Sequence, residues 1–202
     1  FVGDVTAEVL TDALVQSNSV EVLVLEKCGI EEQGLKHLLR ILHKDSHLRE
    51  LYLQNNHIGN QGARLLFKVL VSNTVLRILD LSANYIGDTG TRDLAEGLAS
   101  NRGLRKLVLA KNHIGVSGAR ALCSALREND SLETLDCSHQ SNLGDEGALL
   151  FAEALPSNSS LQHLDLRGNG ISLDCELFFE NTLDLHQSKL NLVLDHTPFE
   201  KS

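Results

Sequence analysis

The stretch LRKLVLAKNHIG, residues 104–115, spaces its leucines as a short strand does and then ends at an asparagine. Nearly the same string stands 28 residues earlier, as LRILDLSANYIG at 76–87, and 56 residues earlier, as LRELYLQNNHIG at 48–59. Alternating leucines such as Leu107 and Leu109 indicate a strand with one buried face. Recurrence of that strand at a fixed step indicates a repeat architecture.

The repeat runs through nearly the whole chain of 202 residues. Its first positions fall at residues 20, 48, 76, 104, 132, 161 and 189, in steps of 28, 28, 28, 28, 29 and 28. Each full unit follows the pattern L-x-x-L-x-L-x-x-N-x-I-G-x-x-G, and apolar residues at helical spacing follow it. The strand and the helix of one unit share a wedge of core that neither can bury alone. Successive units must therefore stack on one another, with their strands parallel.

The unit resembles the leucine-rich repeat, and its length with a full helix resembles the ribonuclease-inhibitor type. It differs from ribonuclease inhibitor in its uniform length, its lack of Trp and its mere four Cys, and it is similar to repeats of NOD-like receptors and related intracellular scaffolds. The resemblance implies an α/β fold: a curved right-handed solenoid, a segment of a leucine-rich repeat horseshoe. It would have a concave parallel β-sheet and α-helices on the convex side.

The asparagine at the ninth position of the unit has a predicted structural role. Its amide can bond backbone groups where strand pairing has ended, so stacked copies are expected to form a ladder. The resemblance implies that cysteine is an alternative at this position, which makes Cys28 structural rather than nucleophilic. The predicted ladder residues are Cys28, Asn56, Asn84, Asn112 and Asn169.

The chain is predicted to be one domain over residues 1–202. Residues 1–19 align with the second half of a unit, 20–188 form six repeats, and 189–202 form a last strand and a C-terminal cap. Pro198 would end propagation there, because proline has no N–H to pair. The chain contains no Met, and we expect it to be a fragment of a larger intracellular protein.

The fifth unit carries one extra residue, and Cys137 replaces its third leucine. We interpret this as a bulge where the strand meets the loop. The bulge is either a neutral insertion or a device that directs Ser138 and His139 towards a ligand. The spacing of the cysteines fits neither a zinc site nor a disulfide pair, so the thiols are predicted to be reduced, which favours a cytoplasmic location.

Composition excludes several classes of function. The net charge of −9 disfavours nucleic acid as a partner, since the chain would repel phosphates. Aromatic residues make up 4% and Trp is absent, which disfavours a small-molecule pocket. No run of apolar residues is long enough to span a bilayer, and no membrane partner is expected. The sequence predicts no cofactor.

Strand positions other than the leucines point away from the core and form the candidate binding surface. The arginines at the second position would form a row that attracts an acidic partner segment, with Tyr52 as an aromatic anchor. Glu50, Asp80 and Asp136 would neutralise part of that row. The alternative is a solvated face of mixed charge. The candidate partner-binding residues are Arg49, Tyr52, Arg77, Asp80, Arg105, Lys106, Asp136, His163 and Asp165.

A second column, His57, Tyr85 and His113, directly precedes the Ile-Gly of three units. It is either a contact patch at the loop edge or a coincidence of repeat usage. The two imidazoles would lie about 10 Å apart, too far to share a metal ion.

Two further motifs do not indicate a functional site. His43 and His47 have helical metal-ligand spacing, but HKDSH aligns with a loop, so no metal site is expected. Asn129 and Asn158 fit the glycosylation pattern but stand at regular loop positions of the repeat.

No phosphate-binding loop, nucleophile elbow or HExxH pair occurs, and Asp136, Ser138 and His139 lack an oxyanion hole. The chain is therefore not expected to be an enzyme. The leading hypothesis is a non-catalytic protein–protein interaction scaffold that binds mainly through the concave face. Two alternatives stay open: a regulator of a small GTPase resembling Ran GTPase-activating proteins, and a pathogen effector that mimics host repeats.

Overall fold

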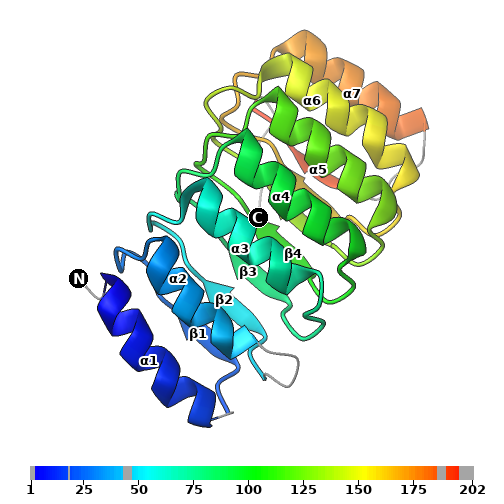
Figure 1. Ribbon diagram of the computed structural model, residues 1–202. Helices are drawn as coiled ribbons and strands as arrows, with labels where there is room; N and C mark the ends of the chain where they lie inside the picture. The colour runs from blue at the N-terminus through cyan, green and yellow to red at the C-terminus, as the bar shows by residue number, and fades with distance from the viewer. Residues whose placement is uncertain (1–2, 18, 43–46, 186–189, 196–202) are drawn as a thin grey trace, which may run out of the picture.

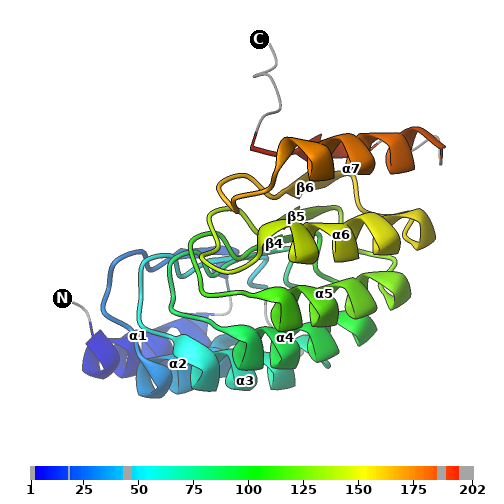
Figure 2. The same ribbon diagram turned by 90° about the horizontal axis from the view of Figure 1, so that it is seen from above.

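The computed structural model describes residues 3–17, 19–42, 47–185 and 190–195. Over these residues the chain is a curved α/β solenoid (Figure 1), in which seven strands form one parallel sheet in the order β1 to β7. Figure 2 shows that the helices form the outer layer of the curve and the strands the inner layer. The predicted curved solenoid is confirmed.

The elements alternate regularly along the chain. The strands are β1 Val22–Val24, β2 Glu50–Tyr52, β3 Ile78–Asp80, β4 Lys106–Val108, β5 Thr134–Asp136, β6 His163–Asp165 and β7 Asn191–Val193. The helices are α1 Gly3–Ser17, α2 Glu32–Leu38, α3 Gly59–Leu70, α4 Asp88–Ser100, α5 Val116–Glu128, α6 Gly144–Ala154 and α7 Leu173–Leu185. Two short 3-10 helices, η1 Leu39–Leu42 and η2 Leu155–Ser157, follow α2 and α6.

The register of the sheet reproduces the sequence repeat. Leu51 pairs with Leu79 and Leu79 with Leu107, each 28 residues apart, and the step from Leu135 to Leu164 is 29. These leucines are at most 1% exposed, because each inward strand position packs against the helix of its own unit and the neighbouring units. The strands are only three residues long, so stacking of units, rather than strand length, supplies the buried area.

Close approach of the helices depends on small residues. At Gly90 in α4, a Cβ atom would lie 2.9 Å from the Cβ of Ala63 in α3 and 2.7 Å from Oδ1 of Asn60. A side chain at that position would push the two helices apart. Glycine is therefore required there by packing.

Helices α4, α5 and α7 are each capped by a side chain of the preceding unit. Gly87 and Gly115, at the N-caps of α4 and α5, have no side chain to cap their helices. Oδ1 of Asn60 instead accepts the N–H groups of Gly87 and Gly90, and Oδ1 of Asp88 accepts those of Gly115 and Gly118. A similar bond joins Asp145 to Ser172 at 2.7 Å. In the fourth unit this position is Val116, whose side chain cannot accept a hydrogen bond, so the start of α6 lacks this link.

The extra residue of the fifth unit does not form the bulge that we expected. The N–H groups of Cys137 and His139 still pair with the carbonyls of Asp165 and Arg167, so the backbone stays in register beyond β5. The insertion instead lies after Gln140, in the loop that precedes α6. A loop can accept one more residue without breaking the pairing of successive units.

Three predictions fall on residues that the structure does not describe. They are residues 43–46 of the HKDSH motif with His43, the seventh unit's first position at Lys189, and the cap residues 196–202 with Pro198. All three lie outside the described residues.

Candidate functional site

Side-chain amides connect the units where each strand ends. Oδ1 of Asn112 accepts the N–H groups of Asn84 and Ile86 at 3.0 Å, and its Nδ2 donates to the carbonyls of Leu81 and Leu109. Asn56, Asn84 and Asn169 are likewise buried and bond the backbone of the preceding unit. Cys28 takes part through its own N–H, which donates to Oδ1 of Asn56, while its thiol lies 3.4 Å from the carbonyl of Glu26.

Gln140 completes this series, and sequence reasoning missed it. Its Oε1 accepts the N–H of Ile114 and its Nε2 donates to the carbonyl of Leu109 at 2.8 Å. Counting from Leu132, Gln140 is the ninth residue of its unit. Its position in the unit could therefore have identified it from the sequence.

A second amide series, also missed, lies at the helix C-termini. Nδ2 of Asn101 donates to the carbonyls of Leu70 and Asn73, and its Oδ1 accepts the N–H groups of Gly103 and Leu104. The members recur in steps of 28, 28 and 29, which was the signal in the sequence; they are Asn73, Asn101, Asn129 and Asn158. Asn129 is only 3% exposed, so its amide is committed to the fold rather than available to a glycan.

The sheet register brings the candidate binding residues onto the inner face in rows. One row runs Glu50, Ile78, Lys106, Thr134 and His163. The next row, two residues further along each strand, runs Tyr52, Asp80, Val108, Asp136 and Asp165. Neighbouring members of a row stand about 4.8 Å apart, so a partner could contact several strands at once.

The arginine row lies at the start of the strands and bonds the backbone. Nη1 of Arg77 donates to the carbonyls of Thr74 and Gly103, both at 2.7 Å, and Nη1 of Arg105 donates to Ser131 at 2.9 Å. Nη1 of Arg105 also donates to the carbonyl of Arg102 at 3.3 Å, so these two guanidinium groups each join the loops of two adjacent units. This fixes their positions but also uses part of their hydrogen-bonding capacity.

The counter-charges of this row are not the expected ones. Arg49 pairs with Glu21 at 3.7 Å and Arg105 pairs with Glu133 at 3.4 Å. The expected acids have other partners, since Glu50 accepts from the Tyr52 hydroxyl and Asp80 from Ser82. Asp136 accepts the N–H of Ser138, so these two residues form a turn rather than a catalytic pair.

Tyr52 and Asp165 occupy different environments in the same row. Tyr52 is half-buried, and its hydrogen bond to Glu50 raises the pKa of its hydroxyl. Asp165 is 4% exposed and lies 2.6 Å from Nη2 of Arg167. Burial acts to raise the pKa of Asp165, but the hydrogen bonds and charge of Arg167 outweigh it and lower that pKa. Asp165 is thus the candidate residue least available to a partner.

The loop-edge column does come together in space. The ring of Tyr85 stacks on His57, with centroids 5.5 Å apart and planes at 9°, and lies 5.9 Å from the ring of His113. The three rings border a pocket of about 270 Å³ that Lys111 and Asn55 also line.

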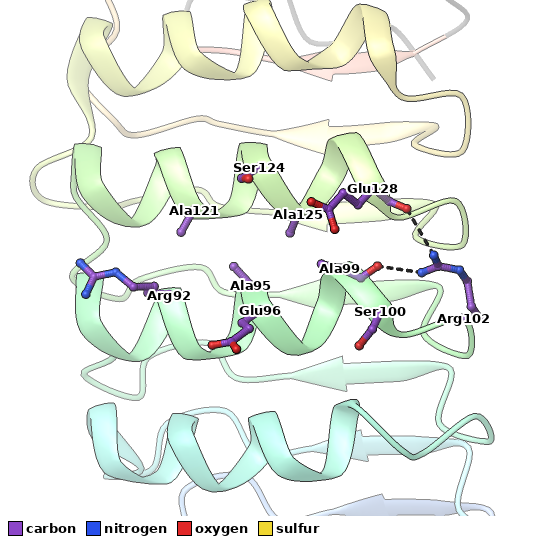
Figure 3. Close-up of a pocket in the computed structure, with 10 residues that line it drawn as sticks. All are labelled: Arg92, Ala95, Glu96, Ala99, Ser100, Arg102, Ala121, Ser124, Ala125 and Glu128. Atoms are coloured by element: carbon purple, nitrogen blue, oxygen red, sulfur yellow. Dashed lines mark hydrogen bonds between the residues drawn. The ribbon is translucent and has the colours of Figure 1, made fainter.

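A groove of about 640 Å³ lies on the convex side between α4 and α5 (Figure 3). Its floor consists of short side chains, and charges of both signs surround it. One of them, Arg102, donates to the carbonyl of Ala99 at 2.8 Å. The lining residues are Arg92, Ala95, Glu96, Ala99, Ser100, Arg102, Ala121, Ser124, Ala125 and Glu128.

The buried thiols are not activated. Burial raises the pKa of Cys123 to about 12 and that of Cys175 to about 11, and it raises the pKa of the fully buried Cys137 well above its usual range. These thiols stay protonated at neutral pH and are poor nucleophiles. Among the described residues, no group of three His, Cys, Asp or Glu side chains is placed to hold a metal ion. No described helix combines the length and apolar character needed to cross a bilayer.

Comparison with solved structures finds the same architecture elsewhere. The structure titled "Leiomodin-1 Actin-Binding Site 2 (ABS2)" is 24% identical, with a TM-score of 0.63 over 76% of this chain and 87% of that one. The tropomodulin C-terminal domain of Caenorhabditis elegans is 19% identical, with a TM-score of 0.60 over 76% of this chain and 93% of that one. An internalin (inlF) of Listeria monocytogenes is 19% identical, with a TM-score of 0.53 over 94% of this chain and 51% of that one. These likenesses establish the fold.

The sequence was also compared with curated proteins and with models of protein families. The comparison with curated proteins found no match. The model described as "Leucine Rich repeat" matches residues 44–67, 72–95 and 100–123, which fall on three successive strand–helix units. It also matches residues 157–174, which fall on the unit of β6 and α7, and it does not match the unit of β5 and α6. With the register and the amide series described above, this match shows that the chain belongs to the leucine-rich repeat proteins.

Proposed function

We propose that this chain is a non-catalytic scaffold that binds a protein partner mainly through the inner face of its sheet. The observation that carries the proposal is the row register, which aligns half-exposed polar side chains from at least five consecutive strands. A curved face of this kind is extended and rigid, and repeat proteins use such surfaces for binding. The similar leiomodin-1 structure is that of an actin-binding site, which supports protein binding by a solenoid of this size.

The chemistry of the face favours an acidic segment of the partner. Arg77 is held in place by two backbone carbonyls, and within the described residues the ion pairs give it no acidic partner. Lys106 is exposed at the centre of the sheet, one strand away. Tyr52, fixed by its bond to Glu50, supplies a rigid aromatic contact beside them. A partner carboxylate would meet Arg77 and Lys106 together.

Reduced thiols support a cytoplasmic location as part of this proposal. All four cysteines are free in the structure, and such thiols are usual in compartments kept reducing by glutathione. Fluorescence microscopy of the tagged chain in its native cell would check this, and secretion of the chain would contradict it.

Binding is tested with a pair of matched variants. Tyr52→Ala with Lys106→Glu alters the inner face, whereas Lys68→Glu reverses an exposed charge on the outer helix α3. Filamentous actin, tested by co-sedimentation, is the first defined partner. In parallel, proteins captured from cell extract by the wild-type chain are compared with those captured by each variant.

We expect the inner-face variant to bind its partner at least about tenfold more weakly, with Lys68→Glu unchanged. A partner bound equally by both variants would show that the inner face is not the main interface. Circular dichroism establishes beforehand that both variants are folded.

A further inference from the structure

The stacked rings at the loop edge form a distinct surface at the opposite end of the strands from the arginine row. We call the side chains of His57, Tyr85, Lys111 and His113 the loop patch. All four are exposed, and Tyr85 is 59% exposed. The rings come from three successive units, so the repeat itself places them beside one another.

The backbone at Tyr85 has an unfavourable conformation for a tyrosine. Its φ is +59°, in the left-handed region where a Cβ atom approaches the backbone. The equivalent positions of the first and sixth units are Gly29 and Gly170, both with φ of +69°. Glycine would serve the turn at Tyr85 equally well, and an exposed ring adds little to the core. The fold therefore does not explain why this position is a tyrosine. A role in binding would explain it.

The charge of the loop patch is positive in a chain whose net charge is −9. Lys111 lines the pocket together with the imidazoles of His57 and His113. Acidic side chains of the same loops already have partners, and one of them, Glu26, accepts a hydrogen bond at 3.4 Å from Nδ2 of Asn55, which lines the pocket. Glu26 pairs with Lys27 at 2.9 Å, and Asp88 accepts the N–H groups at the start of α5.

The pocket has the size of a side chain. Its volume of about 270 Å³ lies below the range of about 300–1,000 Å³ that is usual for small-molecule sites. The amide of Asn56 at its floor is committed to the backbone, so the ammonium of Lys111 and the ring N–H groups are the main donors available.

We propose that the loop patch binds an acidic segment of a protein partner. Its carboxylates would be bound by Lys111 and the imidazole N–H groups, and their aliphatic stems would lie on the stacked rings. This inference rests on the proposed function only in taking the partner to be a protein. It adds a second contact, separate from the inner face of the sheet.

The chain offers a clean probe because it contains two tyrosines. Tyr85 reports on the loop patch and Tyr52 on the inner face. With ¹³C-labelled Tyr and His, ring signals are assigned through Tyr52→Phe and Tyr85→Phe. The labelled chain is titrated with the blocked pentapeptide acetyl-Glu-Leu-Asp-Glu-Leu-amide, and separately with the same peptide carrying Gln and Asn in place of its acids.

We expect the acidic peptide to shift the ring signals of Tyr85, His57 and His113 saturably, and the neutral peptide to leave them unchanged. Lys111→Glu should weaken binding at least about tenfold. Lys68→Glu is the matched control, since it makes the same charge reversal at an exposed position on the outer helix α3, away from the pocket. Tyr85→Gly should abolish the shifts of the two imidazoles while the chain remains folded.

The outcomes separate this inference from the proposed function. Shifts at Tyr52 without shifts at Tyr85 would overturn the loop patch and leave the inner face as the binding surface. Equal binding of the neutral peptide, or no shift at either tyrosine, would also overturn it. The actin and capture experiments test the inner face independently of this result.

Discussion

At the scale of single residues, buried amides are the parts of this chain that substitution disturbs most. An asparagine offers two donors and an acceptor from one short side chain, so it can satisfy strand-end groups of two units together. A leucine in the core loses only contacts when it is truncated, whereas a lost amide leaves several buried backbone groups unpaired.

Asn112→Ala should lower the free energy of unfolding by at least about 2–3 kcal/mol, because two N–H groups and two carbonyls lose their partner. Urea denaturation followed by circular dichroism measures this. Asn142→Ala, at an exposed loop position, is the control and should cost less than about 0.5 kcal/mol. Equal stability of the two variants would contradict the role given to Asn112.

Asp165→Asn should make the free energy of unfolding less dependent on pH in the acidic range. The folded-state pKa of Asp165 lies below its unfolded value, so its contribution is present above about pH 4 and disappears as pH falls through the folded-state pKa. At pH 7 the variant should be less stable by about 1–3 kcal/mol, and the difference should narrow below about pH 4. Thermal melts from pH 3 to 7 measure it, and Asp136→Asn on β5 is measured in parallel as a substitution that leaves the Asp165–Arg167 pair in place. A constant difference would argue against the Arg167 pair as the cause.

Prediction from sequence succeeded at this scale where spacing repeats and failed where it shifts. The asparagines at the ninth position are visible because they stand 28 residues apart. Gln140 was missed because it is a glutamine where the other units have an asparagine, although its amide makes the same bonds. The extra residue of this unit was also assigned to the end of the strand, whereas it lies in the loop. The bonds of Arg77 and Arg105 to carbonyls are also invisible in sequence, since residue type gives no direction to a flexible side chain.

At the scale of elements, the starts of α4, α5 and α7 depend on the unit before them. The usual N-cap lies within the same helix, but here glycine leaves that position to Asn60 or Asp88 of the neighbouring unit. Sequence periodicity predicted the strands and the helical stripes well, because their burial repeats. It could not reveal capping between units, which depends on how closely the helices pack.

Asp88→Ala should lower the free energy of unfolding by about 1 kcal/mol, because the N–H groups of Gly115 and Gly118 lose their acceptor. The substitution is in α4, but the N–H groups that it leaves unpaired lie at the start of α5. Hydrogen exchange should quicken at Gly115 and Gly118 specifically. Asp93→Ala, in the same helix, is the control. If exchange quickened in α4 and not in α5, capping between units would be refuted.

At the scale of the whole molecule, stability is shared between neighbours rather than concentrated in one centre. Leu23 in β1 and Leu192 in β7 are half-buried, whereas the equivalent leucines of β2 to β6 are almost completely buried. Repetition made this architecture the most predictable feature of the chain. The partner surface was the least predictable, because binding side chains occupy the positions that the repeat leaves free to vary.

Native-state hydrogen exchange should therefore be slowest for amides of β3, β4 and β5 and fastest for those of α1 and β7. An inner unit has two neighbours to hold it, and an end unit has one. Mass spectrometry after peptic digestion measures this gradient. Uniform protection along the solenoid would mean that the chain unfolds as one cooperative block.

Val116 stands at the helix-start position that Asn60, Asp88 and Asp145 hold in the second, third and fifth units, and this has a mechanical consequence. Where it stands, no side-chain hydrogen bond among the described residues links the start of α5 to the start of α6. The two units are joined there by packing and by the backbone bridge between Gly115 and Asn142, and the longer loop lies beside it. We expect the solenoid to bend more easily at this junction than at the starts of α4, α5 and α7, where such a bond is present. Such a junction would let one half of the curve tighten while the other keeps its shape.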